Sequence, residues 1–102
     1  AILINRNCAS SCEQFVLYAE QSTKVVLVGE NTGGVLDYGN LHNLTFPCYN
    51  WQLWYPTSRS NRVPDGKAID NIGIAPDVRV PEGTTDWVGF AKGVLEGEAA
   101  PQ

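Results

Sequence analysis

The chain has 102 residues, and its 7 basic and 11 acidic side chains give a net charge of −4. This length suits one domain, and an apolar content of 43% is enough for a hydrophobic core. The acidic balance argues against a nucleic-acid partner or an anionic membrane surface, because both require a basic patch. No apolar run approaches the ~20 residues of a membrane span.

The sequence contains no methionine, so we expect a processed product or an excised fragment. Residues 1–4 already form a buried-strand run, with no turn before them. A strand that is apolar on both faces sits inside a parallel sheet, and some of its neighbours are expected upstream of residue 1. We therefore interpret residues 1–97 as the C-terminal portion of a domain, followed by a frayed tail at residues 98–102.

Three cysteines are present, at positions 8, 12 and 48, so at least one is unpaired. Cys8 and Cys12 are four positions apart and the chain has one histidine, a set that does not match the ligand spacing of a zinc site. We expect no metal and no cofactor. In an oxidising compartment, a disulfide could join Cys48 to Cys8 or to Cys12.

The first part of the chain predicts a parallel β-α-β unit. Residues 1–5 and 24–29 read as buried strands, and residues 11–22 as an amphipathic helix. The apolar stripe of this helix is formed by Cys12, Phe15, Val16 and Ala19. A strand, a helix and a second strand with short links place the two strands parallel to each other.

The remainder predicts a hairpin and a last helix. Residues 44–48 and 51–55 alternate apolar and polar side chains, as in two strands joined by a turn at Tyr49-Asn50. A polar loop follows at residues 57–71, then an extended piece at 74–80 and a helix at 85–96. The predicted class is α/β, with a parallel unit, a β-hairpin and a C-terminal helix.

Ser10 lies where the first strand ends and the first helix begins. This is the end of a parallel sheet at which ligands bind, and the free N–H groups of a first helical turn stabilise developing negative charge. Ser10 and Glu13 also fit the S-x-x-E capping box. The local pattern by itself favours the cap, since no base is visible nearby, and the G-x-S-x-G elbow is absent.

Three motifs occur in a fixed order: S-x-x-E at residues 10–13, G-E-x-T-G-G at 29–34 and D-x-x-G-I-x-P-D at 70–77. This ordered set resembles the tail-specific and tricorn-core serine peptidases of family S41, which include the interphotoreceptor retinoid-binding repeats. The resemblance implies a partial ClpP/crotonase-like fold of ββα units, hydrolysis of peptide bonds, and a peptide or protein substrate.

The resemblance also assigns roles to residues. Ser10 becomes the nucleophile, and the backbone N–H of Ser11 one donor of the oxyanion hole. The loop at Gly33 and Gly34 passes close to the substrate or is simply a turn. Asp70 occupies the position at which the tricorn-like branch carries a glutamate, so it is either an acidic partner of the base or an ordinary turn residue.

The general base is missing from this pattern. The tail-specific branch places a lysine where this chain has Val35, so we expect no Ser–Lys dyad. The tricorn-like branch uses a histidine that lies upstream. His42 is the only histidine and sits in a polar segment, where a solvated loop residue is the plainer interpretation. The resemblance thus implies that the base comes from an upstream part of the same protein, and that this chain alone is inactive.

Several alternatives stay open. Trp51, Trp54 and Tyr55 could line a peptide groove, although we favour core and edge packing, and Arg59 and Arg62 could hold a substrate carboxylate or lie in a solvated loop. A different function is a non-catalytic module that binds a ligand or peptide, as in the retinoid-binding repeats. A third is a structural domain that forms homo-oligomers through exposed sheet edges. We expect an extracytoplasmic location, in the periplasm or cell envelope.

Overall fold

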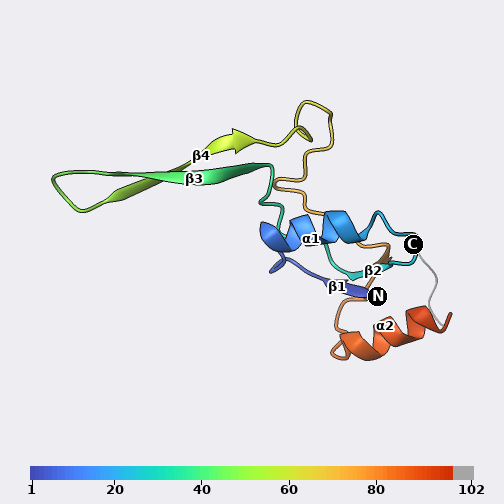
Figure 1. The fold of residues 1–102 in the computed structure, drawn as a ribbon. Helices are drawn as coiled ribbons and strands as arrows, with labels where there is room; N and C mark the ends of the chain where they lie inside the picture. Colours follow the sequence, from blue (N-terminus) through green and yellow to red (C-terminus); the bar gives the residue numbers. More distant parts are fainter. Residues whose placement is uncertain (98–102) are drawn as a thin grey trace.

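The structure is a computed structural model that describes residues 1–97. Its elements, in chain order, are β1 (Ile2–Ile4), α1 (Ser11–Ala19), β2 (Leu27–Gly29), β3 (Tyr38–Thr45), β4 (Gln52–Arg59), β5 (Val78–Arg79) and α2 (Trp87–Leu95). Figure 1 shows a small body that contains both helices, with the hairpin β3–β4 extending away from it. The predicted frayed tail lies outside the described residues.

The body is built on a parallel sheet with the strand order β1-β2-β5. Ile2 lies opposite Leu27, and Val28 lies opposite Val78. The predicted β-α-β unit is therefore confirmed, with α1 as the crossover that two parallel strands require. The central strand β2 is buried throughout, because it has a neighbour on each side.

The two faces of this sheet carry separate apolar clusters. Consecutive residues of a strand point to opposite faces, so Leu27 and Val28 belong to different clusters. Leu27 packs with Val16 of α1, and Val28 packs with Ala91 of α2. The helices consequently cover opposite faces, as Figure 1 shows, and the sheet is the middle of three layers.

The predicted hairpin is confirmed, but its strands are longer than the alternation indicated. β3 begins at Tyr38 and β4 continues to Arg59, with these two residues paired at the base. At the other end, Phe46 donates its amide to the carbonyl of Trp51 at 2.8 Å, so Cys48 lies in the turn and not in a strand. The predicted loop at 57–71 accordingly begins after β4.

Two expectations about the hairpin side chains are wrong. His42 lies within β3 and not in a loop, with its ring 6.4 Å from that of Tyr55 on the opposite strand. Trp51, Trp54 and Tyr55 are 67%, 58% and 43% exposed, whereas we expected packing. Their exposure follows from the extended position of the hairpin, because no helix or sheet among residues 1–97 covers it.

Two aspartates tie the base of the hairpin to the loop that follows it. Asp37 is 1% exposed, and its Oδ2 accepts from the amides of Ile69 and Asp70 at 2.6 and 2.7 Å. Asp70 Oδ1 in turn accepts from the amides of Leu36 and Asp37 at 2.7 and 2.9 Å. Each carboxylate thus satisfies backbone donors of the segment that carries the other.

Stability is expected to fall in acid because of Asp37. Burial alone would raise the pKa of this carboxyl, but the amides of Asp70 and Ile69 and the Arg62 guanidinium outweigh it, so the pKa lies below the ordinary 3.8. A lowered folded pKa gives stability that is present above pH ~4 and lost as the pH falls through the folded value. Urea unfolding against pH should show this slope.

Asp37→Asn is the matched variant for this experiment. It should lower the free energy of unfolding at neutral pH by about 3 kcal/mol, since Arg62 loses its buried partner. Its stability should also depend less on pH below ~4 than that of the wild type. Identical pH slopes for the two proteins would contradict the assignment.

Candidate active site

Ser10 connects β1 to α1 in an unusual backbone conformation. It is the N-cap residue of α1, with φ 56° and ψ −117°, and its side chain is exposed. A non-glycine residue in such a region costs on the order of 1–3 kcal/mol and persists only where the surroundings impose it. A strained strand-to-helix turn that exposes a serine hydroxyl is how hydrolases present a nucleophile, although the glycines of their elbow are absent here.

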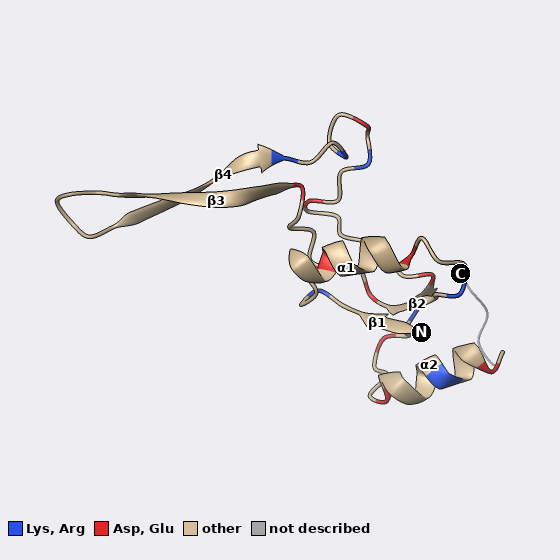
Figure 2. Ribbon diagram, viewed as in Figure 1, with Lys and Arg blue, Asp and Glu red and all other residues tan. Residues whose placement is uncertain are grey.

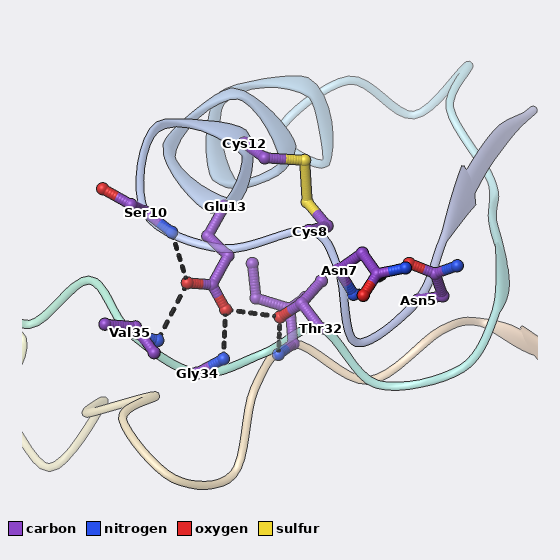
Figure 3. The surroundings of a disulfide bond; sticks show 10 residues. Asn5, Asn7, Cys8, Ser10, Cys12, Glu13, Thr32, Gly34 and Val35 are labelled. Atoms are coloured by element: carbon purple, nitrogen blue, oxygen red, sulfur yellow. Dashed lines mark hydrogen bonds between the residues drawn. A yellow bond between two sulfur atoms is a disulfide. The ribbon is translucent and has the colours of Figure 1, made fainter.

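The capping interpretation of Ser10 is met only in part. Ser10 and Glu13 are arranged as a capping box, and Glu13 Oε2 accepts from the Ser10 amide at 2.9 Å, but no hydrogen bond of ordinary distance and angle joins the Glu13 amide to the Ser10 hydroxyl. In Figure 3 the hydroxyl points away from the Glu13 carboxylate. Within residues 1–97, the Ser11 amide donates no hydrogen bond either. A hydroxyl and the following amide are therefore both available at this turn.

Glu13 does more than cap the helix. It is 0% exposed, and besides the Ser10 amide it accepts from Thr32 Oγ1 at 2.7 Å, from Gly34 N at 2.6 Å and from Val35 N at 2.9 Å. Figure 3 shows this carboxylate between the helix and the segment after β2. Burial alone would raise the pKa of Glu13, but these four hydrogen bonds outweigh it and lower the pKa below the ordinary 4.5.

Thr32 links the second motif to the third. Its hydroxyl donates to Glu13 and accepts from the amide of Ile74 at 2.7 Å, and its own amide donates to the Ile74 carbonyl at 3.1 Å. The three motifs, separated by up to about 60 positions in the sequence, therefore meet at one place. The sequence pattern identified each motif, and the tertiary fold joins them through Glu13 and Thr32.

Gly33 and Gly34 are needed for this close approach. Gly33 donates its amide to the Cys8 carbonyl at 2.8 Å, and a Cβ on it would lie 2.9 Å from the Arg6 carbonyl oxygen. Gly34 has φ 73°, and a Cβ there would lie 2.8 Å from the Gly73 amide nitrogen. Both contacts are too short for a larger residue, so the pair is explained by packing of the motifs against one another.

An open hollow of about 840 Å³ lies beside Gly33, at the carboxyl ends of the three parallel strands. This edge of a parallel sheet is where ligands usually bind. Ser10 is not among the lining residues, which are Arg6, Glu30, Asn31, Thr32, Gly33, Asn71, Ile72, Arg79, Val80 and Glu82. The contact of Gly33 with Cys8 connects this hollow to the turn that carries Ser10.

The remaining candidates are placed as follows. Asp70 makes no hydrogen bond to Ser10 within residues 1–97, and its Oδ1 holds the hairpin base. Arg62 lies in the loop after β4, but its Nε donates to Asp37 at 3.1 Å, so its side chain is held at the hairpin base and is not free in solvent. Asp77, which sequence reasoning treated only as part of a motif, accepts from the Leu27 amide at 2.7 Å and holds β2.

The disulfide differs from the one considered in the sequence analysis. Cys8 and Cys12 are bonded to each other, with their Cα atoms 5.2 Å apart, and Cys48 is free and exposed. Neither of the two possible bonds to Cys48 forms, because Cys48 lies in the hairpin turn, away from the body (Figure 1). The strand-to-helix turn brings the other two within bonding distance.

Residues 1–97 show neither the side-chain cluster of a metal site nor the long apolar helix of a membrane span. Among residues 1–97, no group of three or more His, Cys, Asp or Glu is placed to hold a metal ion. No helix in this range is long and apolar enough to cross a membrane. Figure 2 shows that Lys, Arg, Asp and Glu residues occur on the body and in the loop after β4, with almost none along the hairpin.

Comparison with known proteins agrees with these features. The sequence profile of Peptidase family S41 matches residues 1–80. A crystal structure assigned as an S41 protease from Bacteroides fragilis is 19% identical to this chain, with a TM-score of 0.63. The matched region covers 96% of this chain and 28% of the Bacteroides fragilis chain. A crystal structure assigned as a peptidase from Parabacteroides merdae is 21% identical to this chain, with a TM-score of 0.63. The matched region covers 98% of this chain and 33% of the Parabacteroides merdae chain.

The chain thus spans a third or less of the length of these two proteins. A comparison with curated proteins gave no significant match. The profile covers more than half of the chain, and both structures share its mixed α/β fold with parallel and antiparallel sheets. The chain therefore belongs to peptidase family S41.

Proposed function

We propose that Ser10 is the nucleophile of this peptidase. The observation that carries the proposal is the strained turn at Ser10, which exposes a hydroxyl that closes no cap hydrogen bond and leaves the Ser11 amide without a partner in the described residues. A serine that served only as a cap would use its hydroxyl on the helix. The family membership supplies the reaction type, which is hydrolysis of a peptide bond.

The proposed mechanism follows from this geometry. Ser10 Oγ attacks the carbonyl carbon of the scissile bond, and its proton passes to a base. The Ser11 N–H, at the positive end of α1, donates to the oxyanion that forms. The protonated base then gives its proton to the amine as the peptide bond breaks, and the acyl group remains on Ser10 as an ester. A water molecule hydrolyses this ester in the second step.

The base is proposed to be a histidine from an upstream part of the same protein, within a ClpP/crotonase-like domain. Asp70 Oδ1 accepts two backbone amides, whereas its Oδ2 has no hydrogen bond within residues 1–97. Oδ2 is thus the atom that could orient such a base. The Cys8–Cys12 bond supports an extracytoplasmic location, because disulfides persist in oxidising compartments.

The hairpin supports one alternative function, a module that binds a peptide or a second copy of the chain. An open apolar hollow of about 380 Å³ lies at its turn, beside Phe46, Tyr49 and Trp51. Exposed aromatic side chains of this kind are typical of protein interfaces. A binding module, unlike an enzyme, gives Ser10 no enhanced reactivity, and this difference separates the two functions.

Labelling with a serine-directed fluorophosphonate tests the proposal. The full-length protein should be labelled on Ser10, and Ser10→Ala should abolish the label. Ser11→Ala is the matched control, and it should keep the label because Ser11 contributes only its backbone N–H. A folded full-length protein that takes no label would favour the binding module.

The isolated chain of 102 residues is expected to hydrolyse no peptide, because the proposed base belongs to a segment upstream of it. The measurement is the release of a fluorophore from a mixed peptide library, compared with the full-length protein at equal concentration. Ser10-dependent hydrolysis by the isolated chain would overturn the assignment of the base to an upstream segment.

A further inference from the structure

The turn at Ser10 is held from both sides by bonds that do not involve the Ser10 side chain. The Cys8–Cys12 disulfide joins the residue two positions before Ser10 to the residue two positions after it. The Glu13 carboxylate holds the Ser10 amide itself. Figure 3 shows the disulfide along one side of this turn and the carboxylate on the other.

The two ends of the disulfide lie in different surroundings. Cys8 is only 8% exposed and belongs to the cluster between α1 and the sheet, and its carbonyl accepts from Gly33. Cys12 lies in the first turn of α1 and is exposed. The bond thus fixes the start of the helix to a residue that the core and the second motif already hold in place.

This arrangement explains how the strained backbone conformation of Ser10 is maintained. A conformation near φ 56° relaxes unless the flanking residues are held, and here the disulfide closes a short ring around the three residues 9–11. Opening the ring would leave three hydrogen bonds to hold the turn: Ser10 N to Glu13, Cys12 N to Ala9 O at 3.2 Å, and Gln14 N to Ser10 O at 3.0 Å. The disulfide therefore favours the backbone conformation in which the Ser10 hydroxyl is exposed.

We propose that the Cys8–Cys12 disulfide positions the nucleophile, and that a dithiol reductant switches the site to a less reactive state. This inference rests on the proposed role of Ser10. A thiolate of the reductant attacks the exposed Cys12 sulfur and releases Cys8 as a thiolate; the second thiol of the reductant then closes its own disulfide and releases Cys12. Two electrons and two protons pass to the cysteines, and reoxidation reverses the change.

The test compares the oxidised and reduced full-length protein, with the state of the bond confirmed by mass spectrometry. Reduction should lower the second-order rate of fluorophosphonate labelling at Ser10 by about tenfold or more, since small displacements of a reacting group have effects of this size. For a peptide substrate, kcat should fall while KM changes little, and reoxidation should restore both rates.

Two variants serve as controls. The double variant Cys8→Ala/Cys12→Ala should label slowly and be insensitive to the reductant. Cys48→Ser retains the disulfide and should respond as the wild type does. A reduced wild-type protein that labels as fast as the oxidised one would overturn the inference, as would a reductant effect that persists in the double variant.

Amide hydrogen exchange separates this inference from the proposed function. Reduction should speed exchange at Ser10 and Gly33, whose partners flank the turn, while Leu27 in the central strand stays protected and reports an intact fold. If the oxidised protein takes no label, the nucleophile assignment fails, whatever the exchange shows. If labelling is normal and exchange at Ser10 does not change on reduction, the disulfide is not a positioning element.

Discussion

Replacement of Ser10 by alanine should lower kcat/KM of the full-length protein for a peptide substrate by about 10⁴-fold or more. The reason is that, in the proposed mechanism, Ser10 Oγ forms the bond to the substrate carbonyl, and no other side chain takes over this step. Steady-state hydrolysis of a fluorogenic peptide gives the ratio. Ser11→Ala, which keeps the backbone donor, should change the ratio far less.

The stability of the same variants tests the capping interpretation. Loss of a serine cap costs about 1 kcal/mol, but Ser10 closes no cap hydrogen bond, so Ser10→Ala should leave the free energy of unfolding nearly unchanged. Ser10→Gly should raise it by up to about 1 kcal/mol, because glycine adopts φ 56° without strain. A variant that gains stability and loses activity would identify the strain as functional. If Ser10→Ala loses about 1 kcal/mol and keeps activity, Ser10 is a cap.

Replacement of Glu13 by alanine should have the largest effect on folding. Four donors would lose their acceptor in a site that is 0% exposed, and we expect the free energy of unfolding to fall by at least about 3 kcal/mol. Glu13→Gln keeps the shape and one acceptor oxygen, so its loss should be smaller. Urea unfolding of the full-length protein measures both.

The charge of Glu13 adds a pH dependence. Because its hydrogen bonds lower the pKa below the ordinary 4.5, its stabilisation is present above that pH and is lost as the pH falls through the folded value. Glu13→Gln should remove this part of the acid sensitivity. The wild type and Glu13→Gln having the same stability at neutral pH would contradict the role assigned to this carboxylate.

Local patterns predicted the elements whose signal is local. Two of these elements are strands, β1 and β2, which the apolar runs at residues 1–5 and 24–29 predicted. The third is α1, which the apolar stripe of residues 11–22 predicted. A buried strand and an amphipathic helix can each be recognised from the residues that form them. The alternation at residues 44–55 gave the hairpin. Its true length was missed, since β3 starts in a segment that contains Gly39 and Asn40, which lack a strand signal.

The packing of side chains was not visible in the same way. Trp51, Trp54 and Tyr55 read as packed residues because aromatic side chains usually are, and the structure leaves them exposed. Arg62 read as a solvated loop residue, and it pairs with Asp37, 25 positions away. Such partners depend on how loops return to one another, which no local period encodes.

The sequence by itself determined the parallel β-α-β unit, the position of Ser10 at its turn, and the ordered motifs that point to family S41. Only the tertiary structure decided how Ser10 is presented. The strained turn and the Cys8–Cys12 bond lie within a few residues of Ser10, but no sequence pattern separates them from an ordinary capped turn, and three of the four donors around Glu13 come from a segment 19 to 22 positions away. The physical reason is that capping and oxyanion binding use the same residue types at a helix start, so the three-dimensional bonding of the hydroxyl, and not its sequence context, separates them.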